Sequence, residues 1–118
     1  MIFTLCGSSR FPAAHDIVNM HLTLRGHVVI PLGLYGHADQ PAGARFLTSD
    51  GNDASAAKQL LDEIHLRKID LADAIFVVNV GGYVGSSTRR EIEYARKTGK
   101  DVHWLFPEAE EDGRSSRA

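Results

Sequence analysis

IFTLCG, residues 2–7, is a short apolar run that is rich in β-forming residues and ends in glycine. Three later runs share this character: HVVIPLGL (27–34), AIFVVNV (74–80) and DVHWLF (101–106). All four are continuously apolar rather than alternating, which is typical of strands that are covered on both faces of a sheet. Because segments with helical spacing lie between them, the sequence predicts a single three-layer α/β domain of the Rossmann-like or flavodoxin-like type, with a mainly parallel sheet of four or five strands.

Three helices are expected between these runs. The first follows Pro12 and stops at Gly26, since a proline at the start and a glycine at the end are typical of helix boundaries. The second is expected from about Ala54 to Lys68, and the third from near Ser87 to Gly99. The residues predicted to face the core are Ile17, Val18, Met20 and Leu24 in the first helix, and Leu60, Leu61 and Ile64 in the second.

At 118 residues the chain has room for one folded domain, which we place at residues 1–107. The segment that follows, EAEEDGRSSRA (108–118), has almost no apolar residues and is predicted to be disordered. Residues 35–53 contain most of the turn formers. We interpret them as a lid or substrate loop, or else as an element that periodicity does not reveal.

Charge and hydropathy exclude several classes of protein. A net charge of −2 gives no electrostatic reason to expect nucleic acid or a membrane surface as a partner. The chain has no apolar stretch of about 18 residues and no basic segment ahead of an apolar one, so it is predicted to be neither exported nor membrane-spanning. Its single cysteine, Cys6, cannot form an internal disulfide and is interpreted as a small buried side chain, which fits a cytoplasmic protein.

The segment GSSR (7–10) follows the first apolar run directly, with Gly7 at the end of the strand. Its backbone amides and the hydroxyls of Ser8 and Ser9 would lie near a helix N-terminus, which attracts anions. Arg10 could add a charged contact to a phosphate. The alternative is that a serine only satisfies turn amides while Arg10 is solvated.

The segment GGYVGSSTRREIEYA (81–95) occupies the equivalent place after the third run. In a parallel sheet both loops emerge at the carboxyl edge, where ligands bind, so we predict that Asn79, Gly81 and Gly82 belong to a substrate-binding loop. Thr88 and Glu91 have the spacing of a capping box, which alone would explain the glutamate. Capping does not account for the glycines, which a loop needs only where its backbone must come close to another group.

CGSSR near the start, DEIHLRKIDLADAIFVVNV in the middle and REIEYA near the end resemble, in their order and spacing, the nucleoside 2-deoxyribosyltransferase superfamily, including its nucleoside 5'-monophosphate N-glycosidase branch. The resemblance spans roughly residues 2–106. It implies that Glu91 is the nucleophile, although Glu93 stands where the family commonly has glycine, and that the chain forms a homodimer. The residues that it implies for contact with a phosphate are Gly7, Ser8, Arg10 and Ser87.

His65 marks a departure from that family, because a catalytic aspartate is expected eight residues before Asp73. A histidine in this place is expected to titrate near neutrality, and it could protonate or hydrogen-bond the leaving base or order the attacking water. Asp62, one turn earlier on the same helical face, could orient or charge the imidazole. Asp73 itself falls at the amino edge of its strand and is interpreted as a structural turn residue.

Together with this resemblance, the residues predict an enzyme that hydrolyses the N-glycosidic bond of a (deoxy)nucleoside 5'-monophosphate, a small-molecule substrate, and releases free base and sugar phosphate. No cofactor is expected, and no metal site, because His15, His21 and His37 share no ligand spacing with carboxylates or Cys6. Three alternatives stay open. They are deoxyribosyl transfer between bases, a phosphoribohydrolase of the cytokinin-activating type, which CGSS and GGYVGSSTRRE resemble, and a domain that only senses a nucleotide with Glu91 as a helix cap.

Overall fold

The computed structural model of the chain describes residues 1–33 and 54–107, with side chains from residue 58 onward in the second range. Strands and helices alternate along these residues: β1 (Ile2–Cys6), α1 (Pro12–Leu24), β2 (Val28–Ile30), α3 (Ala54–Leu71), β3 (Ala74–Val77), α4 (Ser86–Lys97) and β4 (Asp101–Trp104). A short 3-10 turn, Val80–Gly82, follows β3. The segments predicted as a lid (35–53) and as a disordered tail (108–118) lie outside the described residues. Within the described ranges, no helix combines the length and the apolar character that crossing a membrane requires.

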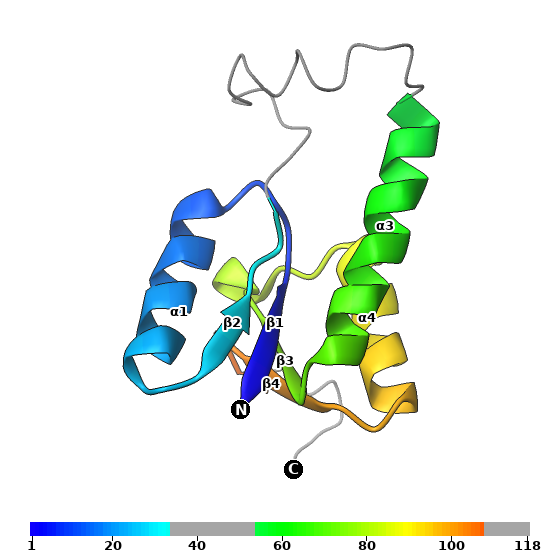
Figure 1. Cartoon of the computed structure of the whole chain (residues 1–118). Coiled ribbons are helices and arrows are strands. Elements are labelled where there is room, and N and C mark those ends of the chain that lie inside the picture. Colours follow the sequence, from blue (N-terminus) through cyan, green and yellow to red (C-terminus); the bar gives the residue numbers. More distant parts are fainter. Residues whose placement is uncertain (34–53, 108–118) are drawn as a thin grey trace.

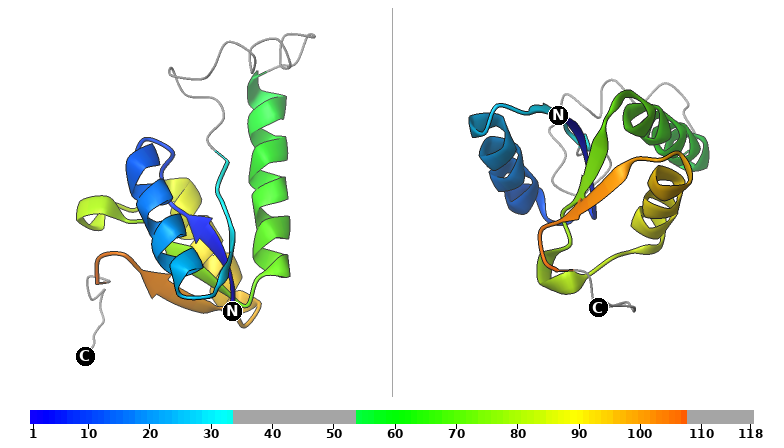
Figure 2. Two further views of the ribbon diagram at one scale, coloured as in Figure 1. Left: turned by 60° about the vertical axis from the view of Figure 1, so that its left-hand side comes forward. Right: turned by 90° about the horizontal axis from the view of Figure 1, so that it is seen from below.

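The strands form one parallel sheet in the order β2-β1-β3-β4, which confirms the predicted α/β class (Figure 1). Helix α1 covers one face of the sheet, and α3 and α4 cover the other, so the described elements form three layers (Figure 2). From the central strand β1 the chain runs outward to β2 and then returns on the other side to β3 and β4. This arrangement is compatible with a single Rossmann-like or flavodoxin-like domain.

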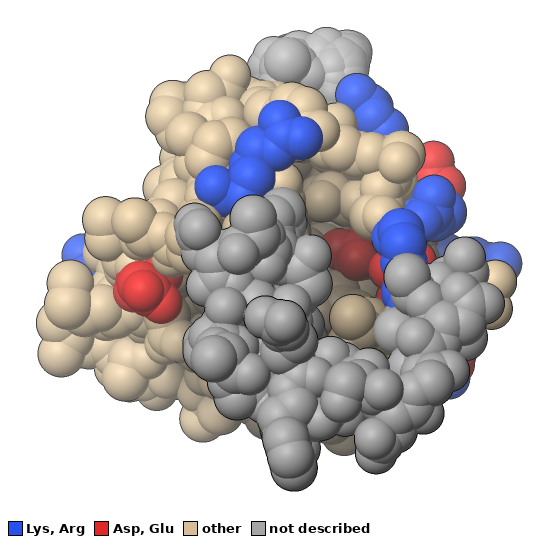
Figure 3. All heavy atoms as spheres, turned by 90° about the horizontal axis from the view of Figure 1, so that it is seen from above, with Lys and Arg blue, Asp and Glu red and all other residues tan. Residues whose placement is uncertain are grey.

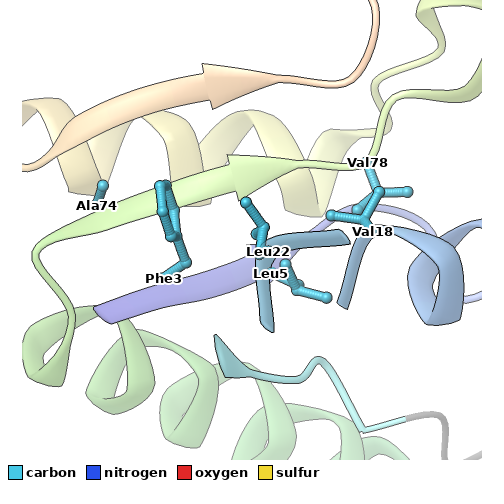
Figure 4. Packing of buried hydrophobic residues seen from close by; sticks show 6 residues of the cluster. All are labelled: Phe3, Leu5, Val18, Leu22, Ala74 and Val78. Atoms are coloured by element: carbon cyan, nitrogen blue, oxygen red, sulfur yellow. The ribbon is translucent and has the colours of Figure 1, made fainter. Parts of the chain in front are cut away.

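Both faces of the central strands are buried, as their unbroken apolar runs predict. On the α1 face the buried cluster consists of Phe3, Leu5, Val18, Leu22, Ala74 and Val78 (Figure 4). On the face covered by α3 and α4 it consists of Cys6, Ile69, Ile75, Val77, Ile92 and Ala95. Each fully buried large apolar side chain in these clusters stabilises the fold by about 1.5–3 kcal/mol.

Helix α1 begins at Pro12 as predicted, but its buried stripe differs from the prediction. The residues that face the core are His15, Val18 and Leu22. The predicted core residues Ile17, Met20 and Leu24 are 61%, 58% and 78% exposed. The prediction counted only apolar residues as core residues, so it assigned His15 to the surface. The His15 ring is buried because its Nε2 atom has a partner, the Ser8 carbonyl oxygen, at 3.1 Å. The helix therefore turns a face toward the core that includes a hydrogen-bonded histidine, and not the face with the most aliphatic residues.

Helix α3 continues past its predicted end at Lys68 to Leu71, and its buried residues include His65 and Ile69. The predicted core residues Leu60, Leu61 and Ile64 are 62%, 42% and 44% exposed. The first half of this helix rises beyond the ends of the strands, where the described residues offer no sheet to pack against (Figure 1). Asp73, in the turn between α3 and β3, is structural as predicted, because its Oδ2 atom accepts a hydrogen bond of 2.7 Å from the amide of Ile2.

Candidate functional site

A pocket of about 320 Å³ lies at the carboxyl ends of β1 and β3. These are the two strands between which the chain changes direction across the sheet, and open parallel sheets bind their ligands at this position. Viewed onto this edge, the surface shows acidic side chains recessed in a hollow, with Lys and Arg side chains beside them (Figure 3). The described residues that line the pocket are Gly7, Ser8, Ser9, Leu32, Gly33, Lys58, Leu61, Asp62, Ile64, His65, Lys68, Tyr83, Gly85, Ser86, Ser87, Thr88 and Glu91.

Gly7 allows the loops after β1 and β3 to meet. Its φ angle of 145° is one that other residues rarely adopt, and a Cβ atom at this position would lie 2.7 Å from the carbonyl oxygen of Val78. The amide of Val78 in turn donates a hydrogen bond of 2.7 Å to the Cys6 carbonyl. A side chain at residue 7 would therefore separate the two loops that form the pocket.

The loop after β1 shows features of both interpretations made from the sequence. The Ser8 hydroxyl accepts a hydrogen bond of 3.2 Å from the Arg10 amide, so it does satisfy a turn amide. The Arg10 guanidinium lies 5.0 Å from the centre of the Tyr83 ring, and Tyr83 lines the pocket although Arg10 does not. Burial lowers the pKa of His15, so its neutral ring can donate to the Ser8 carbonyl and hold this loop in place.

The N-terminus of α4 faces the pocket. The helix begins at Ser86 with Gly85 as its N-cap, and no side chain makes a capping hydrogen bond. The capping box, which was the alternative explanation of Glu91, is not formed, because Thr88 lies inside the first turn, where it is buried, and Glu91 lies in the second turn. The positive end of the helix dipole and the serines of the first turn are left directed at the pocket.

Glu91 is 8% exposed and contacts residues of β1 and α3 rather than its own helix end. Burial raises the pKa of its carboxyl to about 7, and a hydrogen bond with the Cys6 thiol acts in the opposite direction. One of its oxygens, Oε1, lies 3.8 Å from Nε2 of His65. The carboxyl therefore changes its charge near neutral pH, which an exposed glutamate does not do.

His65 is 4% exposed and reaches Glu91 as the spacing predicted. The expectation that it titrates near neutrality is wrong, because burial and the charge of Lys68 lower its pKa to about 4. The ring is thus neutral at physiological pH, and its Nδ1 atom has no hydrogen-bond partner among the described residues. Asp62 does not hydrogen-bond to this ring. Its carboxylate lies 3.3 Å from Lys58 and 3.9 Å from Arg90 instead.

Cys6 is the residue of this site whose role the sequence did not reveal. Its thiol is fully buried, and its Sγ atom lies 3.5 Å from Nε2 of His65. Burial first, and then the charge of Glu91, raises the pKa of this thiol well above its usual value, so the sulfur keeps its proton. A signal for its position did exist, because the last residue of a buried parallel strand lies at the ligand-binding edge of the sheet.

The predicted substrate loop after β3 does not line the pocket. Asn79 is buried, and its side-chain amide exchanges two hydrogen bonds of 3.0 and 2.9 Å with the backbone of Phe106. Gly81 and Gly82 lie in the exposed 3-10 turn with φ angles of 64° and 86°. These three residues shape the turn and tie it to the segment after β4, while the pocket is lined further along the loop, from Tyr83 onward.

Two lysines of α3, Lys58 and Lys68, also line the pocket, and no sequence pattern pointed to them. Lys58 pairs with Asp62 at the rim, whereas the Lys68 ammonium donates hydrogen bonds to the carbonyls of Pro31 and Leu32. Lys68 thereby joins α3 to the segment after β2. Lys58 lies outside the quoted segments and Lys68 inside one of them, but only their place on the helix face toward the sheet edge could have indicated either lysine.

Comparison of the chain with models of known protein families and with curated proteins finds no match.

Proposed function

We propose that this protein binds a (deoxy)nucleoside 5'-monophosphate in the pocket between the loops after β1 and β3 and hydrolyses its N-glycosidic bond with Glu91 as the nucleophile. The observation that carries this proposal is the position of Glu91. A nearly buried carboxyl lies beside a neutral histidine, in a pocket whose rim consists of a glycine-serine turn and a helix N-terminus. A carboxylate and an anion-binding rim in one pocket are what cleavage of a phosphorylated glycoside requires.

The rim provides groups suited to the 5'-phosphate. The first turn of α4 contributes free amides at Ser86 and Ser87, and the Gly7–Ser9 turn lies opposite in the same pocket. Lys58 adds a positive charge, and Arg10 lies just outside the pocket, next to Tyr83, which lines it. A phosphate bound there would fix the position of the sugar relative to Glu91, which is a contribution of orientation to catalysis.

In the proposed reaction the ionised Glu91 carboxylate attacks the anomeric carbon as the bond from that carbon to the base nitrogen breaks. The base leaves with the bonding electron pair. Water then displaces the carboxylate, so its hydroxyl goes to the sugar, its proton balances the departing base, and Glu91 is regenerated. Because His65 is neutral, it acts as a hydrogen-bonding and water-positioning group rather than as a charged acid.

Chromatographic detection of free base from a panel of nucleoside monophosphates tests this proposal. We expect base release from at least one of them, and the variant Glu91→Gln should reduce turnover by about a thousandfold or more while nucleotide affinity stays within about tenfold. Glu93→Gln is the matched control, because this exposed glutamate lies on the same helix two residues away. It should keep wild-type turnover.

The panel also separates the alternatives. Nucleotide binding without base release from any member would contradict hydrolysis and favour a sensing domain. Base release that requires a second free base would identify a deoxyribosyl transferase. Turnover that survives in Glu91→Gln would remove the glutamate from the chemistry.

A further inference from the structure

Three potential metal-binding side chains converge behind the pocket from three different elements. Cys6 comes from β1, His65 from α3 and Glu91 from α4, and all three are buried. Their donor atoms lie within 4.8 Å of one another, with 3.5 Å between the sulfur and the histidine Nε2 and 3.8 Å between that nitrogen and the glutamate oxygen.

The two separations from the histidine Nε2 atom are close to the edges of a zinc coordination tetrahedron. Zinc bonds of about 2.3 Å to sulfur and about 2.0–2.1 Å to nitrogen or oxygen place a sulfur and a nitrogen about 3.6 Å apart, and a nitrogen and an oxygen about 3.3 Å apart. The first separation is thus already in place, and the second needs a movement of the carboxyl by a few tenths of an ångström. Thiolate and imidazole together favour zinc over magnesium or calcium, which prefer oxygen ligands.

Without an ion the three groups are joined through the thiol, which contacts both the Nε2 atom of His65 and the carboxyl of Glu91. The His65 and Glu91 atoms are too far apart for a hydrogen bond, and a thiol is a weak donor with only one proton. A metal ion would replace these weak thiol contacts with direct bonds to all three donor atoms.

We propose that Cys6, His65 and Glu91 bind a zinc ion, with the fourth coordination position open toward the pocket. His65 and Glu91 line that pocket, whereas Cys6 lies behind them with no exposed surface. The open position therefore faces the space into which a small ligand enters. Three protein ligands with one open position are the arrangement of a zinc site that is accessible to water or to a ligand.

The protonation states allow this binding. The neutral ring of His65 offers the lone pair of Nε2, and coordination releases the thiol proton of Cys6 to solvent, together with any proton on Glu91. The thiolate and the carboxylate then balance the two positive charges of the ion, so no net charge is buried.

Binding of the ion would also affect the proposed reaction, and this consequence rests on the proposed function. A zinc ion on the Glu91 carboxylate withdraws the electron pair that the nucleophile needs. Zinc should therefore inhibit base release, and a chelator should restore it. Coordination itself does not depend on that reaction and is tested without it.

Cobalt provides the direct probe, because Cys6 is the single cysteine of the chain. The full-length, reduced protein is stripped with a chelator, desalted and titrated with Co²⁺ under exclusion of oxygen. We expect a thiolate-to-cobalt charge-transfer band in the near ultraviolet and the intense visible bands of tetrahedral cobalt, with one ion bound per chain. Zinc should displace the cobalt and abolish both.

Variants identify the other ligands. Cys6→Ser should remove the charge-transfer band, and His65→Gln and Glu91→Gln should each weaken zinc binding by more than about tenfold, since even the loss of an outer-shell partner costs that much. His21→Gln, a change of an exposed histidine on α1, should leave the affinity unaltered. Circular dichroism establishes that each variant is folded, and Glu91→Gln keeps the test valid if Cys6→Ser does not fold.

A folded wild-type protein that gives no thiolate-to-cobalt band would overturn the site. So would a band that His65→Gln and Glu91→Gln leave at full strength, because the thiol would then bind metal without these two partners. Base release in the presence of a chelator is measured separately, so the zinc site and the proposed hydrolase activity can fail independently.

Discussion

The two faces of the sheet are built from the same strands but differ in what they bury. The cluster under α1 consists of apolar side chains, with His15 placed at its edge to hold the Ser8 carbonyl. The cluster under α3 and α4 is apolar up to the carboxyl end of β1, where Cys6 meets His65 and Glu91. The α1 face therefore serves packing, with one polar contact to the loop after β1, while the other face combines packing with a group of buried polar side chains.

This difference follows from the alternation of side chains along β1. Phe3 and Leu5 point to the α1 face, and Thr4 and Cys6 point to the other. Thr4 meets its hydrogen-bonding need by donating to the Lys68 carbonyl at 2.8 Å, so this buried hydroxyl costs little. Cys6, two residues further, lies at the sheet edge, where its neighbours are titratable groups instead of a backbone carbonyl. The polar cluster is thus confined to the end of the sheet that carries the pocket.

The largest difference between the two faces is expected from a matched pair of core truncations, Leu22→Ala on α1 and Ile69→Ala on α3. Both side chains are almost completely buried, so each change should lower the free energy of unfolding by about 2–5 kcal/mol. Only Ile69→Ala removes packing one turn from His65. Ile69→Ala should therefore also lower the turnover or the zinc affinity of the folded protein, whereas Leu22→Ala should leave turnover and zinc affinity unchanged.

Urea denaturation of the two variants measures the first effect, and assays at temperatures well below each midpoint measure the second. Equal functional losses in both variants would show that the two faces are coupled. The separation of packing from chemistry would then not hold.

An effect of intermediate size is expected from Glu91, whose ionisation should make the free energy of unfolding depend on pH. The pKa of Glu91 is about 7 in the folded protein and near 4.5 for an ordinary glutamate, so between these values the folded chain keeps a proton that the unfolded chain releases. Stability from this group is therefore present below about pH 4.5 and is lost as the pH rises to about 7. Glu91→Gln cannot ionise, so relative to wild type it should gain about 1–3 kcal/mol between pH 5 and pH 8.

The measurement is urea denaturation of both proteins at the two pH values, with a chelator present. His65 contributes in the opposite direction, because its lowered pKa of about 4 makes stability increase as the pH rises toward 6.5. That contribution is present in both proteins, so their difference reports mainly on Glu91 and on its coupling to His65. A difference that does not change with pH would mean that Glu91 is solvated in the folded state.

The sequence was a good guide to the strands, because four unbroken apolar runs leave few alternatives to a buried parallel sheet. It was a poor guide to the helix faces. In α1 and α3 the buried stripes include His15 and His65, and a pattern based on apolar residues assigns such positions to solvent. A histidine whose burial depends on a distant partner is invisible to local periodicity.

Part of the candidate site could be predicted from local spacing, and the rest depends on contacts between distant parts of the chain. Glu91 and His65 were selected from motif spacing, and they do lie together. Cys6 lies 59 residues from His65 in the chain, and only the order β2-β1-β3-β4 brings the end of β1 between α3 and α4. Asn79 was predicted to lie in the substrate loop, but a side-chain amide at a strand end can hydrogen-bond either to a ligand or to a neighbouring backbone segment. Here it hydrogen-bonds to the backbone of Phe106.

The smallest effect is expected from Arg10, which belongs to neither face of the sheet and lies at the exposed edge of the pocket. Its guanidinium is held over Tyr83, so a phosphate contact would need only a modest movement, but solvent screens the interaction. Arg10→Ala should therefore weaken a nucleoside monophosphate by about threefold to tenfold and the corresponding nucleoside hardly at all. Titration calorimetry with both ligands measures this difference, and Arg25→Ala, which removes an exposed arginine beyond the far end of α1, is the control. Equal losses for nucleotide and nucleoside would mean that Arg10 acts only through its contact with Tyr83, and the anion-binding groups would then be the backbone turn at Gly7–Ser9 and the first turn of α4.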